Sequence, residues 1–589
     1  MKGNDFLDFT PSKYQQKILD YFLNEKGNML INALAGTGKS STICMLTEHT
    51  TTSDVYLAFN SSIAAEFKTK IKNPKTKVYT LHALAYSIMN YNIQNENKDA
   101  KEDNVTASRG FGKTRVAGPT SATLDNLKPY KIIEPLIDQQ CGKYSDWNYR
   151  TWLKNNYVSL YNLTRSTMTN VNDSEAIAEL IDTHGIFNSP EEDYMKPDIY
   201  SIVSNLSLLN SRSIEQFEAN KTIDFADMLY ITYYKLKDKK WEVPYYHLYT
   251  NVYLDEAQDN SKLQLSFLPF IKRKNGRIIV VMDKNQAIYM FNGGDAKAFA
   301  IIPKMFAPMK QFDLPVCYRC PVSHLQRVNQ KFNIPILPRD GAPQGFIKTI
   351  QKSDISVYAK AGDLVISRKN KWLSPVVLDL ARHGISVYIE DSDFVKNIHQ
   401  IIKASKCSSV RTLDSHLINK KKKYEEKVAK MKQKIAEKGV NSDKEVAEEI
   451  DLSNSRMDNI EFLITLVKSY PNPTADIGRF DTYIDKILNT TPSPACVRIS
   501  SVHKAKGLEA QNVFVLNEGK VCFDNRNSPE QNQQEKNLSY ISITRAKEGL
   551  YLVVEPPDGS TPKVLLPTVN EVKKNFKGAQ ARQWMVDNL

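Results

Sequence analysis

The sequence predicts an α/β protein built on two parallel sheets, and three patterns support that prediction. Short apolar runs rich in β-branched residues recur, and each ends in a polar or glycine-containing loop before a helical pattern. These runs form two sets that are separated along the chain. Each set is interrupted by a long, polar, mainly helical segment. Repeated strand–loop–helix units are typical of parallel sheets, whose functional loops lie at the carboxyl ends of the strands.

The two sets of strand-forming runs define two lobes. The first set comprises residues 28–41, 54–67, 77–89, 251–260 and 277–286. The second set comprises residues 362–373, 385–389, 496–509, 512–516 and 549–554. We therefore expect a first lobe from 1–90 and 220–312, a second lobe from 313–390 and 496–589, and insertions at 91–219 and 391–495.

Two stretches within the insertions have a distinctive composition. Residues 95–118 are polar, and we expect them to be flexible. Residues 420–439 begin with four lysines and carry aromatic and apolar side chains at helical spacing. Those side chains are Tyr424, Val428, Met431 and Ile435. Gly439 fits a helix C-cap and 442–445 a capping box. We interpret the lysine run as a solvated helix face, with phosphate binding as the alternative.

Net charge, apolar runs and cysteine count limit the kinds of partner and the cell compartment that we expect. The net charge of +13 fits a polyanion such as nucleic acid, or else a solvated lysine-rich surface. No apolar run approaches the ~20 residues that span a bilayer, and the first residues lack the apolar core of a signal peptide. Seven cysteines are few for 589 residues, which favours a reducing compartment. We expect a cytoplasmic protein, or a nuclear one in a eukaryote, without a membrane partner.

One pair of cysteines has the spacing of a zinc or redox site. Cys317 and Cys320 are separated by two residues, and His324 follows. A tetrahedral zinc site needs four ligands, and the sequence has no second pair at this spacing. We therefore predict neither a metal nor a redox function for this pair.

A phosphate-binding loop is predicted at residues 33–41, "ALAGTGKSS", between an apolar strand and a helix. The pattern is that of GxxxxGK[ST], except that Ala33 takes the first glycine position. Lys39 can reach the β- and γ-phosphates, and the Ser40 hydroxyl can bind Mg²⁺. The residues expected around the phosphates are Ala35, Gly36, Thr37, Gly38, Lys39, Ser40 and Ser41. ATP with Mg²⁺ is the expected cofactor.

Acidic residues for nucleotide hydrolysis end the strand at 251–254. Asp255 would hold the hydration shell of the Mg²⁺, and Glu256 would polarise the attacking water. Hydrolysis also needs positive charge at the γ-phosphate. Arg319 in "CYRC" and Arg545 in "SITRAK" are the candidates, and a surface ion pair is the alternative for either one.

Six motifs in order give the chain a family resemblance from about residue 10 to 555. "AGTGKS", "LDEAQD", "DKNQAIYMFNGG", "CYRC", "SSVHKAKGLE" and "LSYISITRAK" resemble motifs I to VI of superfamily one helicases. The branch is that of UvrD, PcrA and Rep, and the F-box DNA helicases within it are similar, although no F-box is visible. The resemblance implies two RecA-like domains, 1A and 2A, with insertions 1B and 2B.

The resemblance also implies roles for individual residues. Gln15, or less favourably Gln16, would read the adenine edge, and Gln286 would sense the γ-phosphate. Glu509 would contact the ribose or phosphates, while Arg319 and Arg545 would be arginine fingers. The residues expected to touch the nucleic-acid strand are Phe59, Asn60, Thr80, His82 and His503. Tyr289 and Phe291 would stack on bases, which is largely independent of base sequence.

Three features depart from the family pattern. Phe291 replaces the usual Trp, which keeps a stacking face of smaller area. Met282 replaces a usual Gly before Asp283. The 2B insertion is short and lysine-rich, so the family's account of 2B cannot simply be carried over.

The resulting hypothesis is an ATP-driven motor that moves 3′ to 5′ on single-stranded DNA and unwinds duplex DNA. Its expected partners are single-stranded and tailed duplex DNA and proteins of replication, recombination or repair, and it would translocate as a monomer. Two alternatives remain: a translocase that strips proteins from DNA, and a nucleic-acid-dependent ATPase that loads partners. RNA also remains a candidate substrate, because stacking hardly distinguishes the sugars.

Overall fold

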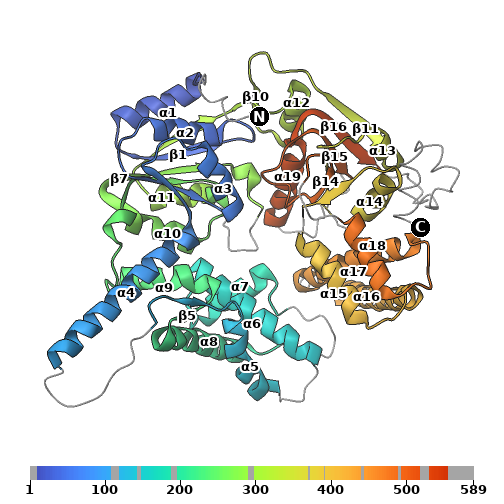
Figure 1. Ribbon diagram of the computed structural model, residues 1–589, viewed down its shortest axis with the longest axis horizontal. Helices are drawn as coiled ribbons and strands as arrows, with labels where there is room; N and C mark the ends of the chain where they lie inside the picture. Colours follow the sequence, from blue (N-terminus) through green and yellow to red (C-terminus); the bar gives the residue numbers. More distant parts are fainter. Residues whose placement is uncertain are drawn as a thin grey trace. The chain divides into compact units, whose positions relative to one another are not determined.

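The protein is described by a computed structural model (Figure 1). The structure describes residues 10–107, 119–141, 147–187, 196–288, 298–368, 372–390, 392–438, 443–488, 493–517 and 529–554. The chain forms two compact units, Met1–Pro315 and Val316–Leu589. Each unit contains a six-stranded sheet whose strand pairs are all parallel. The predicted α/β class with two parallel sheets is confirmed.

The sheet of the first unit has the strand order β3-β2-β6-β7-β1-β8. Its strands are β1 (Asn28–Ala33), β2 (Asp54–Ala58), β3 (Thr76–Thr80), β6 (Tyr249–Leu254), β7 (Lys272–Met282) and β8 (Met309–Leu314). Side chains alternate between its faces, as strand geometry requires. Met29 and Ile31 belong to one buried cluster, whereas Leu30 belongs to the other. The sheet is therefore covered on both faces.

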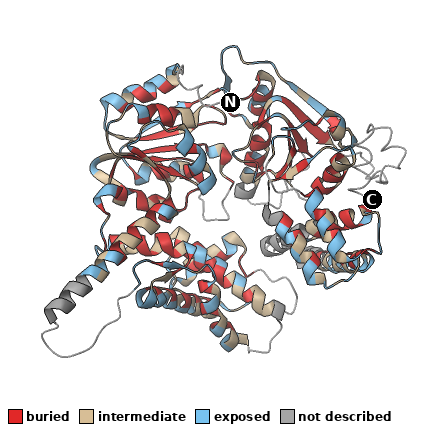
Figure 2. Ribbon diagram, viewed as in Figure 1, coloured by how far each residue is buried: buried red, intermediate tan, exposed pale blue. Residues whose placement is uncertain are grey.

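Helices cover both faces of this sheet. They are α1 (Lys13–Asn24), α2 (Lys39–Glu48), α3 (Ser61–Lys70), α9 (Phe225–Lys237), α10 (Lys262–Ile271) and α11 (Ala298–Met305). Three 3-10 helices accompany them: η1 (Tyr245–His247), η2 (Ala257–Asp259) and η3 (Lys284–Gln286). Figure 2 shows the strands as mostly buried between partly exposed helices. The loops that leave the strand ends therefore rest on a rigid, packed sheet.

The segment between β3 and β6 is mainly helical. It contains α4 (Leu81–Ala107), α5 (Lys128–Cys141), α6 (Trp147–Thr167), α7 (Ser174–His184), α8 (Ile199–Asn220) and the short paired strands β4 (Thr123–Leu124) and β5 (Thr222–Ile223). Its helices have a buried cluster of their own that includes Leu153, Tyr157 and Leu206. The expected flexible stretch at 95–118 was wrong in its first part, because α4 continues to Ala107. Residues 108–118 lie outside the described residues.

The sheet of the second unit has the order β11-β16-β15-β12-β14-β13. Its strands are β11 (Phe346–Gln351), β12 (Leu364–Ser367), β13 (Val387–Ile389), β14 (Val497–Ser501), β15 (Ala510–Leu516) and β16 (Ala546–Val554). The two-residue strands β9 (Val316–Cys317) and β10 (Leu337–Pro338) pair with each other. The other elements are α12 (Val322–Phe332), η5 (Lys352–Asp354), α13 (Ile355–Tyr358), α14 (Leu373–Arg382) and α19 (Pro529–Ile543).

Four helices form the insertion of the second unit: α15 (Ser392–Ser405), α16 (Val410–Lys438), α17 (Asp443–Ser469) and α18 (Ile477–Ile487). Their apolar side chains share one buried cluster with the sheet, so that Leu417 and Phe462 belong to the same core as Val365. The lysine-rich helix is present as α16, with Val428 buried and Lys422 and Lys423 exposed. The predicted caps at 439–442 lie outside the described residues.

Two further observations concern the whole described chain. None of its helices combines the length and apolar character needed to cross a bilayer. The expected lobe boundaries at 90/91, 219/220 and 312/313 fall within α4, α8 and β8. Those boundaries stay predictions.

Candidate nucleotide and nucleic-acid sites

The loop between β1 and α2 has the backbone of an anion-binding site. Gly36 and Gly38 have φ angles of 69° and 85°, a region that L-residues with a Cβ rarely adopt. Gly38 is the N-cap of α2, and it offers no side chain to cap the helix. The amide groups of the first turn of α2 are therefore left to an external acceptor, and the helix dipole favours an anion there.

Ala33, which replaces the first glycine of the loop pattern, causes no strain in this fold. It is the last residue of β1, is buried and pairs in register with Leu314. Ala33 is not one of the described residues whose φ angle is positive. An extended strand residue needs no glycine, so the departure from the pattern leaves the loop geometry intact.

Lys39 and the two predicted acidic residues come together at the end of β6. The Lys39 ammonium forms an ion pair with Glu256. Asp255 accepts hydrogen bonds from the Tyr56 hydroxyl at 2.7 Å and from the Glu256 backbone N–H at 2.9 Å. Burial and the adjacent Glu256 charge raise the pKa of Asp255, while Lys39 opposes the shift. Glu256 itself has a φ of 49°, a strained conformation of the kind found at functional sites.

A chain of hydrogen bonds continues from Glu256 to Gln286. The Gln258 amide donates to Glu256, and the backbone N–H of Asp283 donates to the Gln258 Oε1 at 3.2 Å. The Gln286 amide then donates to Asp283 Oδ2 at 2.6 Å. Burial raises the pKa of Asp283. Thus the structure connects three predicted residues, Lys39, Glu256 and Gln286, through polar groups that end β6 and β7.

Sequence reasoning missed the residues that make these connections. Tyr56 lies inside β2, where a tyrosine reads as core, and its ring does stack on Phe67 at 3.5 Å between centroids. Gln258 lies two residues after Glu256, and this spacing by itself predicts no role. Its role becomes visible only once β6 and β7 are known to be neighbours. Asp283 stands out in the sequence only as the residue that the family pattern retains after Met282. Its position beside Gln286 was the available signal.

Gln15 is placed differently from the other predicted nucleotide contacts. It is fully buried, and its amide donates to the Thr42 hydroxyl at 3.0 Å while its Oε1 accepts from the Ser12 N–H at 3.0 Å. Both ends of the side chain therefore support α1 and α2. Gln16 is exposed and donates to Asp20 at 2.7 Å. The adenine-reading role stays a prediction for either residue.

The strand-contact candidates of the first unit lie where β2 and β3 end. The Asn60 side chain caps α3 by accepting from the Ile63 N–H at 2.9 Å, and Thr80 accepts from the Ala83 N–H at 3.2 Å. His82 stacks on Phe225, with ring centroids 4.2 Å apart and planes 21° apart. Burial lowers the pKa of His82 to about 4, so the ring is neutral at physiological pH.

Phe225 is a second residue that sequence reasoning missed. Its side chain is 55% exposed, although it stands beside the buried Asp224 and Asp227 at the start of α9. An exposed aromatic ring stacked on a predicted strand contact is a natural platform for a base. The signal in the sequence was an aromatic residue between two acidic residues. Phe59 directly follows β2 and precedes Asn60, and Tyr289 and Phe291 lie outside the described residues.

In the second unit, Arg319 and Glu509 lie together. The Arg319 Nε donates to Glu509 Oε2 at 2.7 Å, and its NH1 donates to the Thr544 carbonyl at 3.3 Å. Lys547 is the other partner of Glu509. Burial acts to raise the pKa of Glu509, but Arg319 and Lys547 outweigh it and hold the pKa below its ordinary value. Glu509 therefore holds the first arginine-finger candidate in place.

Arg545 and His503 are the remaining candidates of the second unit. Arg545 is 2% exposed, and its guanidinium donates to the carbonyls of Ile541 and Leu508 at 3.1 and 3.3 Å. Burial, with a smaller contribution from Arg368, lowers the pKa of His503 to about 4. The role of Arg545 as an arginine finger and that of His503 as a strand contact stay predictions.

The donors near the phosphate loop suit a magnesium ion that arrives with a nucleotide. Ser40 is the second residue of α2 and supplies a hydroxyl, and Asp255 supplies a carboxylate, both of which are hard oxygen ligands. In the described part of the chain, no group of three or more His, Cys, Asp or Glu side chains could hold a metal ion. Cys317 and Cys320 are buried free thiols.

Comparison with known proteins places this geometry in a family. The family model for the UvrD/REP helicase N-terminal domain matches residues 13–307, half of the chain, and that for the UvrD-like helicase C-terminal domain matches 496–553. The "ATP-dependent DNA helicase PcrA" of Staphylococcus epidermidis is 19% identical over 57% of this chain and 59% of its own length. The "DNA helicase II" of Haemophilus influenzae is 29% identical over 16% of this chain and 15% of its own length.

A third relative is the "Probable DNA helicase II homolog" of Mycoplasma pneumoniae, which is 26% identical over 28% of this chain and 24% of its own length. The chain thus spans between about a seventh and three fifths of the curated relatives that it matches. The similarity includes part of each unit, because one family model matches within the first unit and the other matches 496–553 of the second.

Proposed function

This chain belongs to the UvrD/REP helicase family, and we propose that it is an ATP-driven motor that moves along single-stranded DNA and unwinds duplex DNA. The observation that carries the proposal is the connection from Lys39 through Glu256, Gln258 and Asp283 to Gln286. It joins the phosphate loop to the end of β7, from which the chain leads toward the predicted base-stacking residues. Such a connection can transmit the state of the nucleotide to the nucleic-acid strand.

The proposed hydrolysis uses the residues in distinct roles. The amides around Gly36 and Gly38 cradle the phosphates, and Lys39 exchanges its ion pair with Glu256 for a phosphate oxygen. Glu256, released from Lys39, orients the attacking water. Bound Mg²⁺ neutralises phosphate charge, and Ser40 and Asp255 would hold it.

The second unit would contribute positive charge during hydrolysis. Arg319 and Arg545 are proposed to stabilise the charge that develops on the γ-phosphate, as the family resemblance implies. A finger of this kind is worth about 10³–10⁵ in kcat. Glu509 supports the proposal for Arg319 because it fixes the guanidinium. Cycles of nucleotide binding and hydrolysis would then drive stepping.

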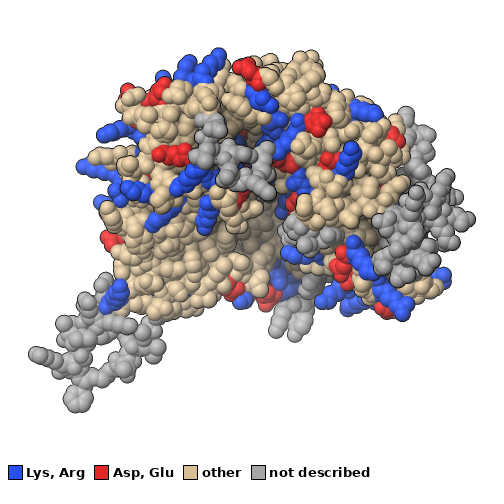
Figure 3. Space-filling view, turned by 45° about the horizontal axis from the view of Figure 1, so that its top comes forward, with Lys and Arg blue, Asp and Glu red and all other residues tan. Residues whose placement is uncertain are grey.

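The finer proposals rest on the family resemblance. We propose 3′ to 5′ movement, a role in replication, recombination or repair, and a translocating monomer in the cytoplasm or nucleoid. The relatives named "DNA helicase II" and "ATP-dependent DNA helicase PcrA" support DNA as the substrate. The positive charge spread over the surface in Figure 3 suits a polyanion.

Two assays with the purified chain test the proposal. ATP hydrolysis should be slow without a polymer, should rise sharply with single-stranded DNA and should rise less with RNA. Duplex DNA with a 3′ single-stranded tail should be unwound, whereas duplex with a 5′ tail should not. Lys39→Ala is the inactive control. DNA-stimulated hydrolysis without unwinding would support the loading or protein-stripping alternatives, and no stimulation by any polymer would contradict the proposal.

A further inference from the structure

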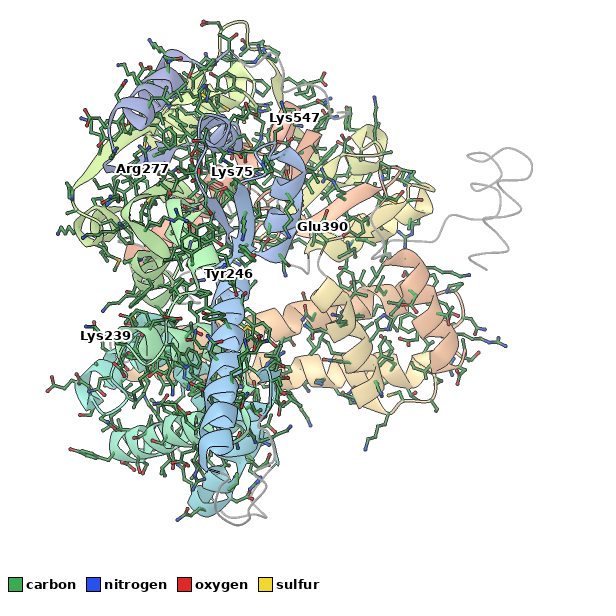
Figure 4. All side chains as sticks on the ribbon, turned by 60° about the vertical axis from the view of Figure 1, so that its left-hand side comes forward. Lys75, Lys239, Tyr246, Arg277, Glu390 and Lys547 are labelled. Atoms are coloured by element: carbon green, nitrogen blue, oxygen red, sulfur yellow. The ribbon has the colours of Figure 1, made fainter. Side chains whose placement is uncertain are left out.

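A cluster of aromatic and basic side chains, two of them exposed and three half-buried, lies beside η1. Tyr245 and Tyr246 are 75% and 50% exposed. Tyr246, labelled in Figure 4, packs edge-on against Tyr91 of α4 at 6.1 Å between ring centroids. Lys77 of β3 and Arg273 of β7 complete the cluster. We call these five residues the η1 surface.

Each exposed tyrosine of the η1 surface has a cation beside its ring. The Arg273 guanidinium lies 5.0 Å from the ring centre of Tyr245, and the Lys77 ammonium lies 5.8 Å from that of Tyr246. Both cations also donate to backbone carbonyls, Arg273 to Leu248 at 3.0 Å and Lys77 to Tyr246 at 3.4 Å. These bonds hold the cations in place without neutralising their charge.

The charge of the η1 surface is hardly balanced by acidic groups. No carboxylate among the described residues forms a salt bridge with Lys77, Arg273 or their neighbours Lys75, Lys272 and Lys274. Glu242 is the acidic residue in contact with the surface, where it accepts from the Tyr91 hydroxyl at 3.3 Å. The surface is thus positive and ready for an anion.

The η1 surface is also rigid. His247, the last residue of η1, is buried and hydrogen-bonded to the Ser87 hydroxyl at 2.8 Å and to the Tyr249 hydroxyl at 3.0 Å. Tyr79 packs edge-on against the same imidazole. Because these contacts fix the backbone of η1, little ordering is needed when a ligand meets the two tyrosines.

We infer that the η1 surface is a second contact site for single-stranded nucleic acid, which extends the strand path proposed above. Exposed rings bind the faces of bases, and adjacent cations bind phosphates. An acidic peptide would use the cations alone and leave the rings without a partner. Tyr91 lies nine residues beyond His82 on α4, roughly 14 Å along the helix axis. Nine residues are about two and a half helical turns, so a strand that leaves His82 and Phe225 must also pass halfway around α4 to reach Tyr246.

Binding to oligothymidylates of two lengths tests the inference, which rests on the proposed binding of single strands. A short oligonucleotide of roughly 8 nucleotides occupies one contact site, whereas one of roughly 30 can reach both. The double variant Tyr245→Ser/Tyr246→Ser should bind the long oligonucleotide at least tenfold more weakly and the short one with unchanged affinity. ATP hydrolysis at saturating short oligonucleotide should not change.

Charge variants give an independent readout. Lys77→Gln and Arg273→Gln should each reduce the slope of log affinity against log salt by about 0.7 for the long oligonucleotide. Tyr245→Phe/Tyr246→Phe keeps the rings and should restore tight binding. Matched controls are Tyr200→Ser, an equally exposed tyrosine at 79%, and Lys310→Gln on the opposite edge strand β8.

The outcomes separate this inference from the proposed function. Wild-type protein that binds neither oligonucleotide contradicts the proposed function itself. If the wild type binds and the serine and glutamine variants bind with the same affinity, the second site alone is overturned. Equal losses of affinity for the short and the long oligonucleotide would overturn it as well. A third outcome would assign the surface to an acidic protein instead. In it, the serine variants keep the wild-type affinity for the long oligonucleotide, and a polyglutamate peptide binds them as tightly as it binds the wild type. The single variant Tyr245→Ser, at the most exposed position, repeats the test if the double variant is unstable.

Discussion

The two units place different charged groups at the loops of the same kind of scaffold. In both, a six-stranded parallel sheet holds the functional loops. The first unit adds an open glycine-rich loop and a group of carboxylates, Asp255, Glu256 and Asp283, with Lys39 as the cation at their centre. The second unit offers Arg319 and Arg545 instead. Since the scaffolds match, the difference in chemistry comes from a few loop residues, which is how one fold serves unlike tasks.

The helical insertions differ as well. In the first unit the insertion has its own core, and its Lys128 and Arg165 form almost fully inaccessible ion pairs with Asp227 of α9. In the second unit the helices share their core with the sheet, and the pair of Lys421 with Glu461 is about one third exposed. The first insertion therefore combines buried ion pairs with an apolar core of its own, whereas the second shares the apolar core of the sheet.

We propose that the first unit binds the nucleotide and that the second supplies catalytic charge, and the largest effect expected from this division is at Lys39. Lys39→Ala should reduce ATP hydrolysis to background and also weaken nucleotide binding, because the loop loses the ammonium proposed to contact the β- and γ-phosphates. Lys70→Ala, in the neighbouring exposed pair with Glu66, is the matched control and should leave both quantities unchanged. Radiolabelled ATP hydrolysis and fluorescent-nucleotide titration measure them. Substantial hydrolysis by Lys39→Ala would place the phosphate site elsewhere.

A smaller and different loss is expected at Arg319. Arg319→Ala should lower kcat by about 10³-fold, about 4 kcal/mol, and leave nucleotide affinity within a factor of about three. The reason is that a finger acts on charge that develops during hydrolysis. Lys348→Ala, an exposed cation on β11, is the control. Should nucleotide affinity fall as far as in Lys39→Ala, the two units would not divide binding from catalysis.

The insertions can be compared by removing one charge from an ion pair that each of them forms. Asp227→Asn leaves Lys128 and Arg165 buried with a single carboxylate, Asp224, and should destabilise the insertion by about 3 kcal/mol. Lys421→Met should cost about 1 kcal/mol or less, since its pair is partly solvated. Hydrogen exchange resolved to the peptides of α6, α9, α16 and α17 measures both. Equal costs would show that burial does not distinguish the insertions.

Local sequence was enough to predict part of this molecule, and tertiary neighbours decided the rest. The loop between β1 and α2 consists of contiguous residues, so the sequence alone predicts a phosphate site at Lys39 and its glycines. The links Tyr56–Asp255 and Gln258–Asp283 join different strands, and sequence order does not say that β2, β6 and β7 are adjacent. Lys128 is a further example. A lysine is expected at the surface, but this one is buried and donates to three acceptors that the sequence does not reveal.

The same limit applies to roles carried over from the family. Gln15 matches the expected position, yet its amide is engaged by Ser12 and Thr42, a use that depends on how α1 packs on α2. Arg545 is likewise held by carbonyls of its own unit. A motif identifies the residue, whereas its hydrogen bonds decide what it is free to do.

An effect smaller than that of Asp227→Asn is expected on the acid stability of the first unit, through His247. Burial, and to a lesser degree Lys77, lowers the pKa of His247 to about 4, below the ordinary value of 6.5. Between these two values the unfolded chain binds more protons than the folded one, so the free energy of unfolding falls as the pH falls. From pH 7 to pH 5 the loss from this residue should be about 2 kcal/mol.

His247→Gln removes the titrating group and keeps a polar side chain beside Ser87 and Tyr249. The variant should be less stable than the wild type at pH 7, but the gap should narrow by about 2 kcal/mol at pH 5. Hydrogen exchange of the peptides around β6 and α4, followed at both pH values, measures this difference. Parallel losses in the two proteins would mean that His247 keeps its ordinary pKa in the fold, which would contradict the lowered pKa.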